Sequence, residues 1–214
     1  MWSRKDKDGD TILVATHVDD SIVTGSNDDK TDTFVREMLE RFDGTCERNL
    51  TEMLCMEWER DIEAGASILH QGAFTEKLLK AFGFWQYSKP TKTPQAPGTR
   101  LSDADKLTTP DPVLHRRYRS IVGALGWLNQ GTRPDISHAY SERSKFVQFP
   151  GQKHMDVAEC CLKYLAGTAD LCIHYGRTKD GKIDNASQST VQCIQMKTLF
   201  PEFRMCKLHC PYKR

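Results

Sequence analysis

Apolar residues in the first third of the chain form short runs that are separated by turn residues. Residues 12–18 and 22–24 are two β-branched runs, and Asp19 and Asp20 lie between them. β-branched residues are enriched in strands, whereas Asp suits tight turns because its short side chain can hydrogen-bond nearby backbone groups. The pattern therefore predicts a strand, a turn that carries two adjacent carboxylates, and a returning strand.

Further along the chain, the apolar positions follow a helical period more often than a strand period. A second, weaker hairpin is predicted over residues 50–62 and 67–70, and a short strand over 171–175. Helices are predicted after the capping residues Asn27 and Asp28, before Gly83, and in three segments of the second half. These three segments are 114–130, a helix that starts near Thr132, and 152–166. The predicted fold class is α+β.

Gly123 and Gly126 interrupt the apolar period of the helix predicted over residues 114–130. Glycine lowers helix stability by about 1 kcal/mol relative to alanine, so each position requires a reason. Two reasons remain open: a neighbouring helix that packs closely, or a nucleic acid backbone that approaches the helix.

Residues 86–113 are predicted to form a linker. They contain five prolines, which exclude a helix through most of the segment. We therefore expect a first domain over residues 1–85, the linker over 86–113, a helical region over 114–182, and a divergent tail without regular structure over 183–214.

Composition limits the classes of protein to which the chain can belong. Hydrophobic residues make up 38% and charged residues 28% of the 214 residues, so the chain can bury a core. No apolar run is long enough for a membrane span, and the first ten residues lack the apolar core of a secretory signal. We expect an intracellular protein, cytoplasmic or nuclear and not secreted, whose eight cysteines are free thiols.

The net charge of +1 combines an acidic first half with a basic second half. Residues 1–113 have a surplus of Asp and Glu, and residues 114–214 have a surplus of Lys and Arg. A basic half suits a surface that faces phosphates, although ordinary surface charge would produce the same surplus.

The acidic turn and its flanks resemble the palm-domain metal hairpin of reverse transcriptases. The sequence from Val18 to Asn27, Val-Asp-Asp-Ser-Ile-Val-Thr-Gly-Ser-Asn, resembles that of the same hairpin in the copia class of long-terminal-repeat retrotransposons. Further blocks follow in the order of that family: 54–61, 74–83, 93–94 with 101–102, 118–128 with 132–136, then Pro150, His154 and 163–168. The resemblance covers about residues 11–182.

This resemblance implies a partial polymerase palm, followed by a helical thumb and connection region. It implies RNA-directed DNA synthesis by the intact parent, with Mg²⁺ held by the catalytic carboxylates Asp19 and Asp20 and an RNA/DNA template–primer as partner. The family also uses a carboxylate from an earlier strand and fingers that hold the nucleotide, and neither is recognised in this chain. We therefore expect this fragment to be inactive alone.

Five basic residues are candidates for contact with the template–primer. Arg and Lys make most phosphate contacts, which points to Arg116, Arg117, Arg119 and Arg133, with a solvated helix face as the alternative. The fifth candidate is His17, which stands where the family usually has Tyr. His154 is expected to cap or pack a helix.

Two other functions compete with the polymerase fragment. One is a non-enzymatic remnant, or a co-opted fragment, that only binds nucleic acid. The other is a metal-binding adaptor that uses Cys206, His209 and Cys210 in the tail, although their spacing matches no standard zinc site. The Asp6, Asp8 and Asp10 series does not match a calcium loop, because Thr11 stands where such a loop requires Gly.

Overall fold

The computed structural model describes residues 1–48, 50–61, 66–107, 109, 111–175 and 203–208. The chain divides into two compact units. The first contains Met1–Leu54 and Cys193–Arg214, and the second contains Cys55–Gln192. Each unit mixes helices with antiparallel strands, so the predicted α+β class is confirmed.

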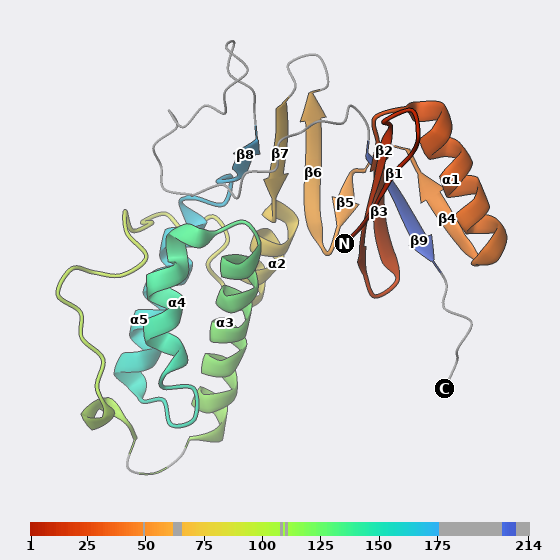
Figure 1. Ribbon diagram of the computed structural model, residues 1–214. Helices are drawn as coiled ribbons and strands as arrows, with labels where there is room; N and C mark the ends of the chain where they lie inside the picture. The colour runs from red at the N-terminus through yellow and green to blue at the C-terminus, as the bar shows by residue number, and fades with distance from the viewer. Residues whose placement is uncertain (49, 62–65, 108, 110, 176–202, 209–214) are drawn as a thin grey trace. The chain divides into compact units, whose positions relative to one another are not determined.

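The first unit is a five-stranded sheet with one helix (Figure 1). Its elements are β1 (Trp2–Lys5), β2 (Thr11–His17), β3 (Asp20–Gly25), α1 (Asp28–Arg41), β4 (Gly44–Glu47) and β9 (Phe203–Leu208). The two-residue β5 (Glu52–Met53) also lies in this unit but is not a strand of its five-stranded sheet. The strand order is β1-β2-β3-β9-β4, and β9 is antiparallel to both of its neighbours. β3, α1 and β4 thus form a split βαβ unit, with β9 inserted between its two strands.

β9 differs from our expectation that the tail lacks regular structure. Its residues Phe203–Leu208 carry no strong strand pattern of their own. The strand forms where β3 and β4 both present backbone groups that need partners, and this demand is not visible in the tail sequence. The other residues of the tail lie outside the described part of the chain.

The core of the first unit joins the sheet to α1. Val14 and Val23 are directly opposite each other on β2 and β3, and both pack with Val35 of α1. The helix begins where expected, because the Asn27 side chain accepts a hydrogen bond from the backbone N–H of Lys30 (3.2 Å). Gly25 permits this close entry, since a Cβ there would lie 2.2 Å from Thr31 Oγ1.

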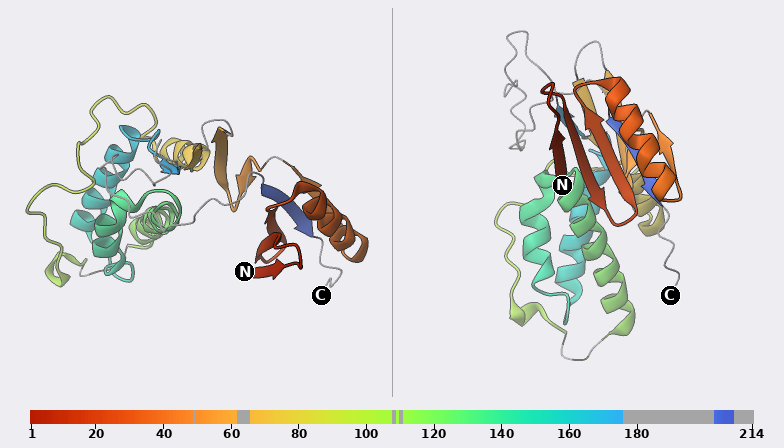
Figure 2. Two further views of the ribbon diagram at one scale, coloured as in Figure 1. Left: turned by 45° about the horizontal axis from the view of Figure 1, so that its top comes forward. Right: turned by 45° about the vertical axis from the view of Figure 1, so that its right-hand side comes forward.

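The second unit combines a small antiparallel sheet with a bundle of helices (Figures 1 and 2). Strands β6 (Met56–Asp61), β7 (Ala66–His70) and β8 (Ile173–Tyr175) pair in that order. The helices are α2 (Gly72–Phe82), α3 (Pro112–Gly131), α4 (Ser137–Ser144) and α5 (Gln152–Ala166), with 3₁₀ turns η1 (Asp103–Asp105) and η2 (Pro134–Ile136). The predicted hairpin and the helix over 152–166 are confirmed.

The division between the units differs from the boundary that we predicted in the linker. Leu79 of α2 is fully buried in the same cluster as Ile121 and Leu125 of α3 and Leu162 of α5. In addition, the Gln71 Oε1 atom accepts hydrogen bonds from the backbone N–H and hydroxyl of Thr132. α2 and the hairpin before it therefore belong with the helical region. The prolines of residues 86–113 do not show that this segment contacts α4 and α5, as it does in the structure.

The linker is held against the bundle by specific contacts. The Arg143 guanidinium, which is fully buried, donates to the backbone oxygen of Pro94 (3.0 Å) and to the Gln95 side chain (3.2 Å). The Thr91 hydroxyl donates to the backbone oxygen of Cys160 (3.3 Å). In the described part of the chain, no helix combines the length and apolar character that crossing a membrane requires.

Candidate functional site

The acidic turn lies at the tip of the β2–β3 hairpin, as the sequence predicts. His17 and Asp20 are the last paired residues, so Val18 and Asp19 form a two-residue loop. Asp19 is exposed and Asp20 is half-buried. Such loops need a positive φ at the first central residue, and Val18 adopts φ +54°. A left-handed conformation costs about 1–2 kcal/mol for a residue with a side chain.

Alternation along the strands determines which face of the sheet Asp20 occupies. Val14 and Val23 face α1, and His17 and Asp20 each lie three residues away from one of them. Because successive side chains alternate between faces, His17 and Asp20 occupy the face opposite α1. The tip thus places Asp20 away from the helix, and leaves Asp19 and Val18 in solvent, where Val18 is 82% exposed.

The two carboxylates at the tip suit one hydrated magnesium ion but not a pair of ions. Mg²⁺ binds through one or two carboxylates and keeps several waters. A two-ion site needs carboxylates that hold both metals about 3.5–4 Å apart. Among the residues that the structure describes, no group of three or more His, Cys, Asp or Glu side chains could hold a metal. The described chain therefore lacks the full ligand set of a two-metal centre.

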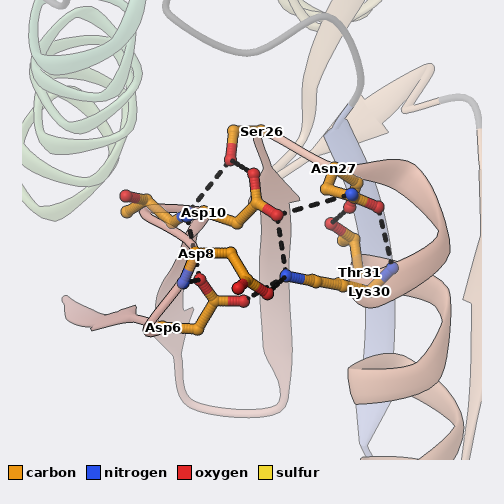
Figure 3. A network of polar contacts seen from close by, with 8 residues as sticks. Asp6, Asp8, Asp10, Ser26, Asn27, Lys30 and Thr31 are labelled. Atoms are coloured by element: carbon orange, nitrogen blue, oxygen red, sulfur yellow. Dashed lines mark hydrogen bonds and ion pairs between the residues drawn. The ribbon is translucent and has the colours of Figure 1, made fainter.

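A separate acidic cluster lies at the other end of the hairpin, and a lysine occupies its centre (Figure 3). The Lys30 ammonium forms ion pairs with Asp6, Asp8 and Asp10, the last two at 2.8 Å. Hydrogen bonding to Lys30 lowers the pKa of Asp6 and of Asp10 below the ordinary carboxyl value. These carboxylates are thus engaged by a cation of the protein itself, in agreement with the mismatch to a calcium loop.

The same cluster joins the β1–β2 loop to the start of α1. Asp10 accepts hydrogen bonds from Ser26 Oγ (3.1 Å) and Asn27 Nδ2 (3.4 Å), which follow β3 (Figure 3). Asp6 Oδ1 accepts from the backbone N–H groups of Asp8 and Asp10. These contacts fix the base of the hairpin whose tip carries Asp19 and Asp20.

Three of the four arginine candidates lie on the surface of α3. Arg116, Arg117 and Arg119 are exposed. Arg117 pairs with Glu159 of α5 (3.1 Å) and lies over the ring of Phe82. Arg116 and Arg119 are three residues apart, so they share one face of the helix.

Arg133 is not on the surface, which corrects our expectation that it contacts phosphates. It is 1% exposed and forms two parallel hydrogen bonds with the Asp135 carboxylate. It also donates to the backbone oxygen and hydroxyl of Thr168. The capping-box-like pair that the sequence suggested between Thr132 and Asp135 is therefore replaced by an ion pair, and α4 starts only at Ser137, after η2.

The two glycines of α3 have different surroundings. A Cβ at Gly126 would lie 2.8 Å from the Tyr140 ring, so this glycine permits α3 and α4 to pack closely. A Cβ at Gly123 would meet no atom within 4 Å, and the residue is exposed. The fold of the described chain therefore explains Gly126 but not Gly123.

Trp127 extends the exposed face of α3 and was missed by our sequence analysis. It lies four residues after Gly123, which places it one turn further along the same face, and it is 39% exposed. We call Arg116, Arg119, Gly123 and Trp127 the open face of α3. The helical period of these four positions was the signal in the sequence that could have identified it.

Known proteins that resemble this chain come from mobile genetic elements. The Pol polyprotein from transposon TNT 1-94 of Nicotiana tabacum is 26% identical over 204 residues, which is 89% of this chain. The Pol polyprotein from transposon RE1 of Arabidopsis thaliana is 31% identical over 159 residues, or 73% of this chain. The putative transposon Ty5-1 protein of Saccharomyces cerevisiae is 27% identical over 179 residues, or 82% of this chain.

The chain is a homologue of retrotransposon Pol polyproteins. It spans 15% of the length of the tobacco Pol polyprotein, 10% of the Arabidopsis one and 55% of the yeast protein. No family model and no solved structure matches the chain.

Within this Pol homologue, the structure describes one of the three residues of the metal-binding alternative in the tail. Cys206 lies in β9, which pairs with β3 and β4 through its backbone. His209 and Cys210, the other two proposed ligands, lie outside the described residues.

His154 has the role that the sequence suggested. It is fully buried, and its Nδ1 atom accepts a hydrogen bond from the backbone N–H of Gly151 (2.8 Å) at the start of α5. Its ring packs on Phe146, with centroids 4.4 Å apart. Burial lowers the pKa of His154 below its ordinary value, so the ring is neutral at pH 7.

Proposed function

We propose that the chain is a template–primer-binding segment of a copia-type reverse transcriptase, in which the open face of α3 contacts nucleic acid. The observation that carries this proposal is Gly123, an exposed glycine in the middle of a long helix with open space around it. A glycine in the middle of a helix lowers the stability of the helix, but it also permits another backbone to approach the helix closely. The neighbours Arg116, Arg119 and Trp127 offer phosphate contacts and an aromatic surface on the same face.

The acidic hairpin supplies the second part of the proposal. Asp19 and Asp20 would hold one Mg²⁺ in the parent polymerase, and the bound metal would activate the primer hydroxyl. The chain itself supplies the rigid support for these carboxylates. The Lys30 cluster fixes the base of the hairpin, and Val18 holds the tip in a two-residue turn.

Binding to an RNA–DNA hybrid duplex tests the role of the open face. We expect Gly123→Leu to weaken binding strongly, because a branched side chain would keep the duplex away from the helix, whereas Gly123→Ala should weaken it less. Removing two phosphate contacts in Arg116→Gln/Arg119→Gln should reduce the salt slope of binding by about 1.8. Fluorescence anisotropy at several salt concentrations measures both effects.

Lys145→Gln is the matched control for charge, since Lys145 is exposed on the same unit and pairs with Glu142. The proposal is wrong if Gly123→Leu and the double arginine variant bind the duplex as tightly as the unchanged chain and with the same salt slope.

Primer extension on a homopolymer template tests the expectation that this chain is inactive alone. We expect no incorporation above background, because Asp19 and Asp20 have no third carboxylate near them among the described residues. Incorporation that disappears in Asp19→Asn would overturn this expectation and would show that the hairpin forms a complete catalytic site. The same result would argue against the alternative function, a remnant that only binds nucleic acid.

A further inference from the structure

Residues 77–102 of the second unit form a basic and aromatic segment inside the acidic half of the chain. The segment contains five Lys and Arg residues and no Asp or Glu. Four aromatic residues are grouped within it: Phe82, Phe84, Trp85 and Tyr87. Basic residues interleaved with aromatic ones are a feature of surfaces that bind nucleic acid single strands.

The end of α2 determines how these aromatic residues are presented. Gly83 takes the left-handed conformation (φ +79°), and the Phe84 backbone N–H donates to the Leu79 oxygen (2.8 Å). This is a Schellman motif, in which the residue after the glycine packs back on the helix. Phe84 accordingly is buried, at 8% exposure, and it anchors the segment that follows.

Phe84 is also the first residue of a four-residue turn, residues 84–87, that places Trp85 on the surface. The Tyr87 backbone N–H donates to the Phe84 oxygen (3.2 Å), and Gln86 adopts φ +57°. A turn of this kind favours glycine at that position, so Gln86 stores strain of about 1–2 kcal/mol. Trp85 lies at the corner of the turn with 36% of its surface exposed. Backbone strain that exposes a large aromatic residue is expected at a binding surface.

Three aromatic rings around this turn, those of Phe82, Trp85 and Tyr87, each have a cation beside them, and the cations come from three helices. Lys80 Nζ lies 5.5 Å from the centroid of the Trp85 ring. Lys163 Nζ of α5 lies 5.7 Å from the Tyr87 ring, and Arg117 of α3 lies 5.4 Å from the Phe82 ring. We call these residues the α2-turn patch: Lys80, Phe82, Trp85, Tyr87, Arg117 and Lys163.

The charge of this surface is positive after its ion pairs are counted. Glu76 pairs with Lys80, and Glu159 pairs with Arg117. Lys163 forms no ion pair with any residue that the structure describes. The neighbouring segment adds further lysines at positions 77, 89 and 92. Such a surplus attracts a polyanion.

We propose that the α2-turn patch binds single-stranded nucleic acid, with a base stacked on Trp85 and phosphates held by the surrounding lysines. An exposed ring can stack only on a base that is not already stacked within a duplex, so the patch favours an unpaired strand. The proposal deepens the proposed function, since it assumes a nucleic acid partner and assigns its unpaired strand to a second surface. Arg116, Arg119 and Gly123 of the open face are not part of the patch.

Anisotropy with a labelled oligouridylate tests the proposal. We expect Trp85→Ala to weaken binding about tenfold, because stacking on one aromatic residue is worth that much. Trp85→Phe, which keeps a ring, should restore most of the affinity. Lys163→Gln should lower the salt slope by about 0.7, the value for one contact with a single strand. Lys145→Gln, an exposed lysine elsewhere on the unit, should change neither quantity.

The hybrid duplex used above separates this proposal from the proposed function. We expect Trp85→Ala to leave duplex binding unchanged, and Arg116→Gln/Arg119→Gln to leave oligouridylate binding unchanged. The patch proposal is overturned if Trp85→Ala binds oligouridylate like the unchanged chain, or if Lys145→Gln weakens binding as much as Lys163→Gln. Failure to bind the duplex, with oligouridylate binding still dependent on Trp85, would overturn the role of the open face alone. Circular dichroism confirms that each variant is folded.

Discussion

Residues of the same type in this chain differ in whether they are buried in the fold or exposed on its surface. Gly126 and Gly123 lie on the same helix and look alike in the sequence, yet only Gly126 is required by a neighbouring ring. Arg133 and Arg116 were equal candidates for phosphate contact, yet Arg133 is buried in an ion pair. Burial was the deciding property in both cases, and it depends on residues far away in the chain.

His154 predicts a stability that depends on pH. Its native pKa is lowered, so the folded protein binds this proton less readily than the unfolded chain does. The contribution is complete above the unfolded pKa of about 6.5 and is lost as the pH falls toward the lower native value. Protonation would also place a hydrogen on the Nδ1 atom that accepts from Gly151. Chemical denaturation between pH 7.5 and 5 should therefore show that the free energy of unfolding falls as the pH is lowered. The loss should not exceed what the titration of one histidine can contribute.

His154→Asn should flatten this dependence, since Asn can accept the Gly151 hydrogen bond without titrating. His138→Asn, at an exposed position on α4, is the control and should retain the slope of the unchanged chain. A slope that survives in His154→Asn would show that another group is responsible.

At the scale of elements, the local patterns predicted most of what formed. The hairpin at Asp19 and Asp20, the helix after Asn27 and the helix over 152–166 all depend on caps, turns and periods that are complete within their own segments. The weaker predictions concerned junctions. The start of α4 depends on Arg133, whose partner Thr168 lies 35 residues further along the chain.

The Arg133 junction predicts a large effect on stability. Arg133→Met removes the cation that satisfies Asp135 and the backbone oxygen of Thr168. Breaking such a buried pair should cost about 3 kcal/mol of unfolding free energy. Tyr164→Phe, which removes only the hydroxyl that bonds Asp135 (2.9 Å), should cost about 1 kcal/mol. Urea denaturation compares the two, and equal losses would contradict the importance of the ion pair.

At the scale of the whole molecule, the resemblance predicted the origin of the chain better than its division into units. Its blocks agree with the similarity to retrotransposon Pol polyproteins. The predicted boundary in the linker was displaced, because α2 buries its apolar face with α3 and α5. An amphipathic pattern shows that a helix has a buried face, but it does not identify the partner that covers the face. The hairpin that carries the acidic tip was predictable because its turn depends on adjacent residues, whereas the difference between Gly123 and Gly126 and the gathering of cations in the α2-turn patch needed the folded arrangement.

The position of β9 has a consequence for how the chain is made. Translation releases β3 and β4 well before the strand that separates them, Phe203–Leu208, has been synthesised. Until then, both partners expose unsatisfied backbone edges, which are the usual starting points for aggregation. The acidic hairpin therefore reaches its finished sheet only after the residues of the second unit, which lie between β4 and β9 in the sequence, have been synthesised.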